Sequence, residues 1–221
     1  MNIAKTVSFI AVGDAAIDFD DVAARCEAVG FEGIVIDRIV PPPAGLPYRP
    51  TSDLTGGAHQ YDAIISLHGN DAALRQLEWN DMLGSAPDMV HSYAVEARLV
   101  FDRGAPRQVG TSAGFKLFGR LMFHADMPDS AARRSWALHA GLAERVHVGA
   151  SRYVQNWVVE MLTPGCPETR GMPEMSFPSE ADLIDRFFDS DRGRDEILQD
   201  TAHFVAWGPR FYAIEQVVRL G

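Results

Sequence analysis

Tyr93-Ala-Val-Glu-Ala-Arg-Leu-Val100 and Tyr212-Ala-Ile-Glu-Gln-Val-Val-Arg219 are matching stretches that each close one half of the 221-residue chain. Each starts with Tyr-Ala, continues with Val or Ile and then Glu, and goes on with mostly apolar residues. The openings of the halves also correspond, because Lys5 to Val12 and Lys116 to Phe123 are short runs rich in β-branched or aromatic residues, which predict strands. This repetition predicts the same structural unit twice.

The segments between these strands follow one order in both halves. In the first half the patterns predict helix, strand, strand, helix and closing strand at 19–29, 31–40, 61–67, 71–83 and 89–101. In the second half they predict a helix at 128–146, strands at 152–162 and 174–177, and a helix that begins at 179. A further helical stretch from about 193 to 205 and a closing strand at 211–220 follow. The order is βαββαβ twice, as in a ferredoxin-like unit.

A single βαββαβ unit leaves one apolar face of its four-stranded antiparallel sheet uncovered. We therefore expect an α+β fold in which two tandem ferredoxin-like repeats, at 1–101 and 114–221, pack sheet to sheet as an intramolecular dimeric α+β barrel. Residues 102–113 form the linker by composition. The long loops 41–60 and 163–173 occupy equivalent places and are either lids over a pocket or tolerated surface insertions.

The overall charge narrows the class of partner. The formal net charge of −10 argues against nucleic acid, and no basic cluster suggests a membrane surface. No stretch approaches the roughly 20 apolar residues of a membrane span, and the first residues do not resemble a signal peptide. Cys26 and Cys166 fit free thiols in a reducing cytoplasm, although a disulfide stays open. We expect a cytoplasmic protein.

A histidine lies on the predicted core-facing stripe of the helix at 128–146. The stripe recurs at helical spacing and comprises Ala132, Trp136, His139, Ala140 and Ala143. An imidazole there, with small neighbours, could act as a general acid or base near neutral pH. The alternative is an ordinary core histidine that hydrogen-bonds to a neighbour.

Residues from about 115 to 220 resemble the EthD family. The resemblance rests on a series of motifs in family order: Trp136-x-x-His139-Ala140-x-Leu142-Ala143, Arg152-Tyr-Val-Gln-Asn156, Glu174-Met-Ser-Phe-Pro-Ser179, Asp200-Thr-Ala-His-Phe204 and Tyr212-x-x-Glu215. It implies that His139 and Asp200 are the site residues of a cofactor-free enzyme acting on a hydrophobic, aromatic small molecule. The first half lacks the helix Trp and His, so one such site exists per chain.

The strand at 152–162 supplies further candidate contacts. Tyr153, Gln155 and Trp157 share one face, and Asn156 lies on the other, but the sequence does not say which face meets the helix. Tyr153, Asn156 and Trp157 join Trp136, Arg120 and His124 as expected substrate-binding residues, although aromatic residues of this kind are more often core. Where the family carries Arg or Lys after the first strand, this chain has Met122-Phe-His124, which departs from the pattern. Asp200 and His203 could pair on one helix face, or be solvated.

No motif for a phosphate, dinucleotide or metal site is present, so we expect no cofactor and no metal. The leading hypothesis is a lyase, of dehydratase or decarboxylase type, in which His139 moves a proton. Such an enzyme would act in the metabolism of aromatic compounds. A cofactor-independent monooxygenase and a non-catalytic small-molecule binder stay open. The chain could form a homodimer of fused barrels. Fusion, however, already covers the apolar sheet face that single-unit relatives cover by dimerising.

Overall fold

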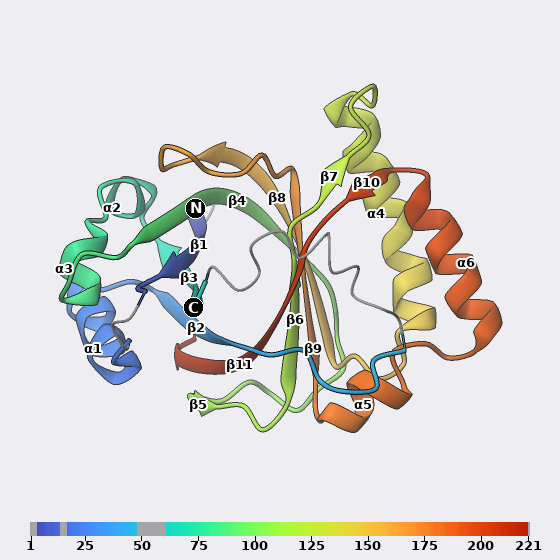
Figure 1. The fold of residues 1–221 in the computed structure, drawn as a ribbon, viewed down its shortest axis with the longest axis horizontal. Helices are drawn as coiled ribbons and strands as arrows, with labels where there is room; N and C mark the ends of the chain where they lie inside the picture. The colour runs from blue at the N-terminus through green and yellow to red at the C-terminus, as the bar shows by residue number, and fades with distance from the viewer. Residues whose placement is uncertain (1–3, 14–16, 48–60, 221) are drawn as a thin grey trace.

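The computed structural model describes residues 4–13, 17–47 and 61–220 of the chain. Its centre is a closed barrel of antiparallel strands (Figure 1). The eight barrel strands are β1 (Ala4–Ala11), β2 (Gly33–Val40), β3 (Ala63–Gly69), β4 (Met89–Asp102), β6 (Phe115–Gly119), β8 (Arg152–Met161), β9 (Gly171–Phe177) and β11 (Arg210–Arg219). Three short strands complete the set: β5 (Gly110–Thr111) pairs with β11, and β7 (Met122–Phe123) pairs with β10 (Val205–Trp207).

The two halves of the barrel have one strand order. The spatial order of the strands is β2-β3-β1-β4 in the first half and β8-β9-β6-β11 in the second. If the long strands of each half are numbered along the chain, both halves have the order 2-3-1-4. The halves meet where β4 pairs with β8 and where β11 pairs with β2. The expected barrel is thus confirmed, although its two halves join edge to edge in one closed sheet and do not pack sheet to sheet. Edge strands carry unpaired backbone groups, and closure into one sheet satisfies them.

Helices cover the outside of the barrel on two opposite sides (Figure 1). On one side lie α1 (Phe19–Val29), α2 (Asp71–Arg75) and α3 (Trp79–Leu83). On the other lie α4 (Asp129–Val146) and α6 (Asp191–Ala202), with α5 (Glu180–Asp185) near the lower end. The long helix expected at 71–83 is broken in two. The break directs Trp79 into the core, where its indole N–H donates a hydrogen bond to Ser92 Oγ at 3.1 Å.

Local caps fix where several helices begin. The side chains of Asp18, Asn70, Ser179 and Ser190 accept hydrogen bonds from first-turn amides of α1, α2, α5 and α6. Such caps satisfy backbone donors that a helix leaves unpaired.

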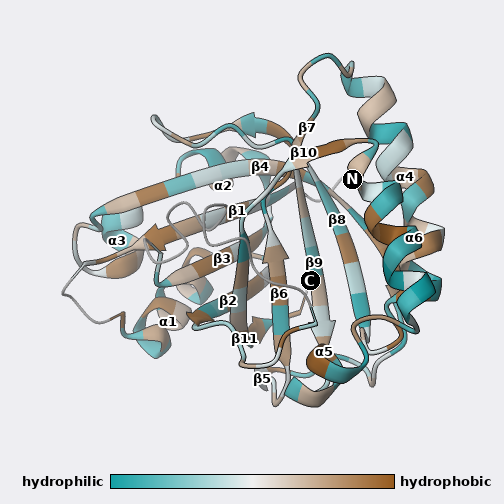
Figure 2. Cartoon of the chain, turned by 45° about the vertical axis from the view of Figure 1, so that its right-hand side comes forward, coloured by the Kyte–Doolittle hydropathy of each residue, from teal (hydrophilic) through white to brown (hydrophobic). Residues whose placement is uncertain are grey.

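Strand alternation gives the barrel an interior face and an outer face that meets the helices. One part of the interior is aromatic and apolar, including Phe9, Tyr61, Tyr93, Phe118 and Phe211. Outside the barrel, a cluster on the first-half side packs α1, α2 and α3 on the sheet, and two clusters on the other side pack α4, α5 and α6. Figure 2 shows hydrophilic and hydrophobic bands alternating along α4 and α6, as expected for helices with one buried side.

Within the described residues, no helix is long and apolar enough to cross a membrane. Cys26 is buried, Cys166 is half-buried, and both are free thiols. The disulfide that the sequence left open is therefore not formed.

Candidate functional site

A cavity of about 120 Å³ lies between α4, α6 and the outer face of the second-half strands. Most of the cavity wall is apolar, and a few polar side chains line the rest of it. Residues that matter for its chemistry are Trp136, His139, His147, Tyr153, Thr201 and Arg210. An apolar pocket with a few polar groups is the usual form of a small-molecule site.

His139 lies on the side of α4 that faces this cavity, as the helical stripe predicts. The buried residues of α4 include Ala132, Ala140 and Ala143, whose small side chains allow the helix to approach the sheet. The imidazole is 9% exposed, and its edge meets the Phe204 ring with centroids 5.4 Å apart. It is thereby held in one orientation at the cavity wall.

Asp200 of α6 holds the other side of the imidazole. Its Oδ2 lies 2.6 Å from His139 Nδ1, although the residues are 61 positions apart in the chain. A carboxylate only accepts hydrogen bonds, so Nδ1 carries the hydrogen and donates it. Within the described residues, Nε2 of His139 has no hydrogen-bond partner, which leaves its lone pair available to a ligand.

Burial lowers the pKa of His139 below its ordinary value of about 6.5, although the hydrogen bond and the charge of Asp200 both act to raise it. The imidazole is therefore neutral at pH 7. A neutral imidazole with a fixed Nδ1 hydrogen is the form that accepts a proton at Nε2. The arrangement suits a general base.

Replacement Asp200→Asn is expected to lower the pKa of His139 further, because it removes the two effects of Asp200 that raise this pKa. Two-dimensional ¹H–¹⁵N NMR of the imidazoles over pH 4–8 measures the shift and the tautomer. His147, whose Nδ1 donates to Phe187 O at 2.7 Å, serves as the internal control for the tautomer, which should not change. A His139 pKa that stays the same or rises in Asp200→Asn would contradict this geometry.

The face of β8 that meets α4 is the one with Tyr153, Gln155 and Trp157. Trp136 Nε1 donates to Tyr153 Oη at 3.1 Å, and Gln155 Nε2 donates to Trp136 O at 2.7 Å and to Tyr153 Oη at 3.2 Å. Burial raises the pKa of Tyr153 to about 12, so the phenol stays protonated. Since its oxygen accepts twice, its own hydrogen is available to a ligand oxygen in the cavity.

The other expected contacts do not lie with His139. Asn156 is on the opposite face of β8, inside the barrel, because side chains alternate along a strand. Trp157 stacks on Phe123 with ring centroids 5.4 Å apart and does not line the cavity. These placements correct the expectation that Asn156, Trp157, Trp136 and Tyr153 share one pocket.

Arg120 and His124 also lie elsewhere. Arg120 follows β6 into the barrel, where its guanidinium is buried among the rings of Phe9, Tyr61 and Phe211 and donates to Tyr61 Oη at 3.3 Å. His124 Nε2 lies 2.9 Å from Ala202 O and ties the end of β7 to α6. Neither lines the cavity beside His139.

His147 lines the cavity although the sequence reasoning passed over it. It caps the C-terminus of α4, eight residues after His139, so the same helical stripe extends to it. Its Nδ1 hydrogen is used on Phe187 O, and burial lowers the pKa of His147 to about 4. Continuing the stripe by one turn would have found it. His203, by contrast, is exposed at the end of α6, and Asp200 pairs with His139 instead.

No group of three or more His, Cys, Asp or Glu side chains within the described residues is arranged to hold a metal ion.

No family model and no curated protein sequence matches the chain. Solved structures do match over nearly its full length. An anthrone oxidase-like protein has a TM-score of 0.60 at 9% identity, covering 99% of this chain and 94% of that one. A candidate monooxygenase of Fusobacterium nucleatum has 0.58 at 12%, covering 98% and 92%. A chlorite dismutase variant of Candidatus Nitrospira defluvii has 0.53 at 10%, also covering 98% and 92%. At these identities the likeness concerns the fold, and the chain has the fold of the dimeric α+β barrel proteins.

Proposed function

We propose that this chain is an enzyme that moves a proton on a small hydrophobic molecule, with His139 as the general base and Asp200 as the residue that positions it. The observation that supports this most directly is the 2.6 Å Nδ1–Asp200 contact on an imidazole whose Nε2 has no partner among the described residues. A pair of this kind fixes tautomer and orientation and stabilises the imidazolium after proton transfer.

The size of the cavity limits the ligand. Its 120 Å³ is close to that of an engineered protein cavity of about 150 Å³ that holds benzene. A molecule of roughly one aromatic ring fits this volume. Trp136 and Met175 provide apolar wall, which suits a ring. This supports the aromatic substrate class expected from the EthD resemblance.

In a lyase, Nε2 of His139 removes a proton from a carbon of the substrate, and the electron pair forms a double bond as a hydroxyl group leaves. The imidazolium returns the proton to the departing hydroxide, so the products are an alkene and water. The Tyr153 hydroxyl donates a hydrogen bond to the substrate oxygen on which charge develops.

An oxygen-dependent reaction is the second candidate. Two proteins of similar structure, an anthrone oxidase-like protein and a candidate monooxygenase, favour it. The first step is the same, because His139 removes a proton from the substrate. The resulting carbanion forms a bond to O₂, and the hydroperoxide that results after protonation loses water to leave a ketone, so one oxygen atom enters the product and the other leaves as water. The two candidates thus differ in whether O₂ is consumed.

Turnover of single-ring aromatic substrates is expected to need no O₂ if the lyase proposal holds. The measurement is product formation by mass spectrometry, in air and under rigorous anaerobic conditions, with O₂ uptake recorded in parallel. Loss of turnover without O₂ would replace the lyase by the oxygenase. Ligand binding without turnover in either condition would leave a non-catalytic binding protein.

The ratio kcat/KM is expected to be constant at neutral and alkaline pH and to fall toward acid pH. The base must be neutral, and the pKa of His139 lies below 6.5, so protonation in acid removes the active form. In Asp200→Asn the fall should begin at still lower pH. A wild-type profile that rises toward acid pH would exclude His139 as the base.

We further propose that the chain is a tandem fusion of two ferredoxin-like units, 1–101 and 114–221, with the second unit related to the EthD family. The common strand order of the halves supports the fusion. The meeting of His139 and Asp200 supports the relationship, since these are the residues onto which the family's helix His and late Asp map.

A further inference from the structure

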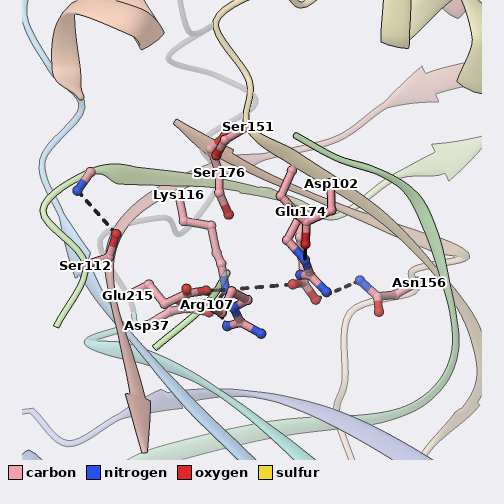
Figure 3. A network of polar contacts seen from close by, with 12 residues as sticks. Asp37, Asp102, Arg107, Ser112, Lys116, Ser151, Asn156, Glu174, Ser176 and Glu215 are labelled. Carbon is pink, nitrogen blue, oxygen red and sulfur yellow. Dashed lines mark hydrogen bonds and ion pairs between the residues drawn. The ribbon is translucent and has the colours of Figure 1, made fainter. Parts of the chain in front are cut away.

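The interior of the barrel contains a group of buried charged side chains that the cavity beside His139 does not use. Five strands of the barrel contribute Lys5, Asp37, Lys116, Glu174 and Glu215, each less than a tenth exposed. Figure 3 shows several of them converging inside the barrel, with Arg107 and Asn156 beside them. Charged side chains are almost never fully buried unless they are paired, so this group needs an explanation.

Lys5 and Lys116 form the ion pairs that hold this group together. Lys116 Nζ lies 2.9 Å from Asp37 Oδ2, 2.6 Å from Glu215 Oε2 and 3.7 Å from Glu174 Oε2. Lys5 Nζ forms an ion pair with Glu174 and donates to Asn156 Oδ1 at 2.9 Å. The acids are therefore already occupied by the two ammonium groups.

A cavity of about 200 Å³ opens beside these groups inside the barrel. Four basic side chains line it, and one acid, Glu174, does so. The basic residues are Lys5, Arg107, Lys116 and Arg152. Asp37 and Glu215 do not line it, so the wall of this cavity presents mainly positive charge.

Two polar atoms around the cavity lack a hydrogen bond. Ser66 Oγ, on a residue 2% exposed, has no partner, and Arg152 Nε lies 3.3 Å from Asp102 Oδ2 without hydrogen-bond geometry. A buried donor without a partner is less favourable than the same donor hydrogen-bonded to water. A ligand that accepts hydrogen bonds would recover this loss.

The pKa values of two groups that line this cavity, His68 and Lys5, are lowered. Burial lowers the pKa of His68 to about 4, with further lowering by Lys5, Arg107 and Arg152. Burial also lowers the pKa of Lys5, and the charges of Lys116 and Arg152 add to this against Glu174. In both cases burial is the largest cause, the neighbouring cations lower the pKa further, and the charge of Glu174 opposes them.

A ligand can reach the inner cavity beside the linker that joins the two halves. Arg107 and Arg152 also line a second cavity of about 540 Å³, between residues 102–114 and the ends of β8, β9 and β11. Arg107 lies 3.0 Å from Glu215 Oε2, and Ser112 N donates to Glu215 O at 2.7 Å, so the linker is fastened to β11. The inner cavity thus adjoins a polar cavity at the linker.

We propose that the barrel interior binds a small oxyanion, a carboxylate or a phosphate, which enters beside the 102–114 linker and is held by Lys5, Lys116, Arg107, Arg152 and the Ser66 hydroxyl. The site is separate from the cavity at His139 and lies on the other face of the sheet. It gives the chain a second ligand, independent of the hydrophobic one.

The test is isothermal titration of the purified chain with inorganic phosphate and with malonate, and thermal denaturation with each anion against sodium chloride of equal ionic strength. Each removed hydrogen bond to an anion is worth about tenfold in Kd. Ser66→Ala, which removes only an unpaired hydroxyl, and Arg152→Gln are each expected to weaken binding about tenfold. The matched control Arg98→Gln, on an exposed outward position of β4, should bind as wild type does.

The outcomes separate clearly. Tighter binding of malonate or of phosphate supports the site and tells which oxyanion it prefers. Anions that act no more strongly than chloride, or variants Ser66→Ala and Arg152→Gln that bind like wild type, would mean that the cavity holds water only and overturn the proposal. Binding should persist in His139→Gln, so failure of the proposed enzyme function leaves this test unaffected.

Discussion

Replacing His139 by Gln is expected to lower kcat by about 10²- to 10⁴-fold, the range that general acid–base catalysis contributes. Gln has a similar size and its amide can donate to Asp200, but it cannot take up a proton at the position of Nε2. KM should change little, because the apolar wall of the cavity is kept. Steady-state kinetics on the substrate found by product screening gives both constants, and circular dichroism checks that the fold is intact.

The control is His203→Gln, which changes an exposed histidine three residues after Asp200 and should leave kcat within twofold of wild type. It reproduces the chemical change close to the site without touching the imidazole that faces the cavity. Unchanged turnover of a folded His139→Gln variant would remove His139 from the mechanism, and with it the proposed proton transfer.

Replacing Lys116 by Met is expected to destabilise the protein by about 3–5 kcal/mol at pH 8, the usual cost of removing one partner from a buried ion pair. The ammonium is 2% exposed and contacts Asp37, Glu174 and Glu215. Without it, three carboxylates stay in the barrel with too little positive charge. Urea denaturation followed by circular dichroism measures the free energy of unfolding.

The loss should be smaller at pH 5. Burial raises the pKa of Asp37 to about 7, although Lys116 acts to lower it. A folded-state pKa above the unfolded value means that Asp37 contributes stability at low pH, and that this contribution is lost as the pH rises from about 4 to 7. At pH 5 Asp37 is protonated in the folded state and needs less compensation, whereas at pH 8 it is ionised.

Two comparison variants sharpen this measurement. Lys116→Met combined with Asp37→Asn should recover part of the lost stability at pH 8, because one unpaired charge is removed. Arg25→Met, which breaks an exposed ion pair with Asp21 on α1, should cost less than about 1 kcal/mol. A Lys116→Met loss as small as that of Arg25→Met at both pH values would contradict the buried network.

Much of the barrel could be predicted from the two halves of the sequence. The matching closing strands and the alternation of apolar residues predict β4 and β11, and the stripe on α4 predicts an inward His139. Each of these signals is local, since spacing along one element tells which of its sides is buried. The broken helix at α2 and α3 was not predictable in this way, because the contact of Trp79 with Ser92 across the core decides it.

The same limit applies to the two ligand sites. Nothing in the spacing predicts that Asp200 meets His139, or that Asn156 turns away from Trp136 to join Lys5 and Glu174. In the strands, Lys5, Lys116 and Glu174 look like single polar residues, and only closure of the barrel brings them together.

The sequence by itself determined most of the helices and strands and the buried side of α4, because these depend on interactions within a few residues. The tertiary structure decided which elements face one another. That choice depends on hydrogen bonds between strand edges far apart in the chain, β4 with β8 and β11 with β2, which close the sheet and so fix what lies inside the barrel and what lies under α4.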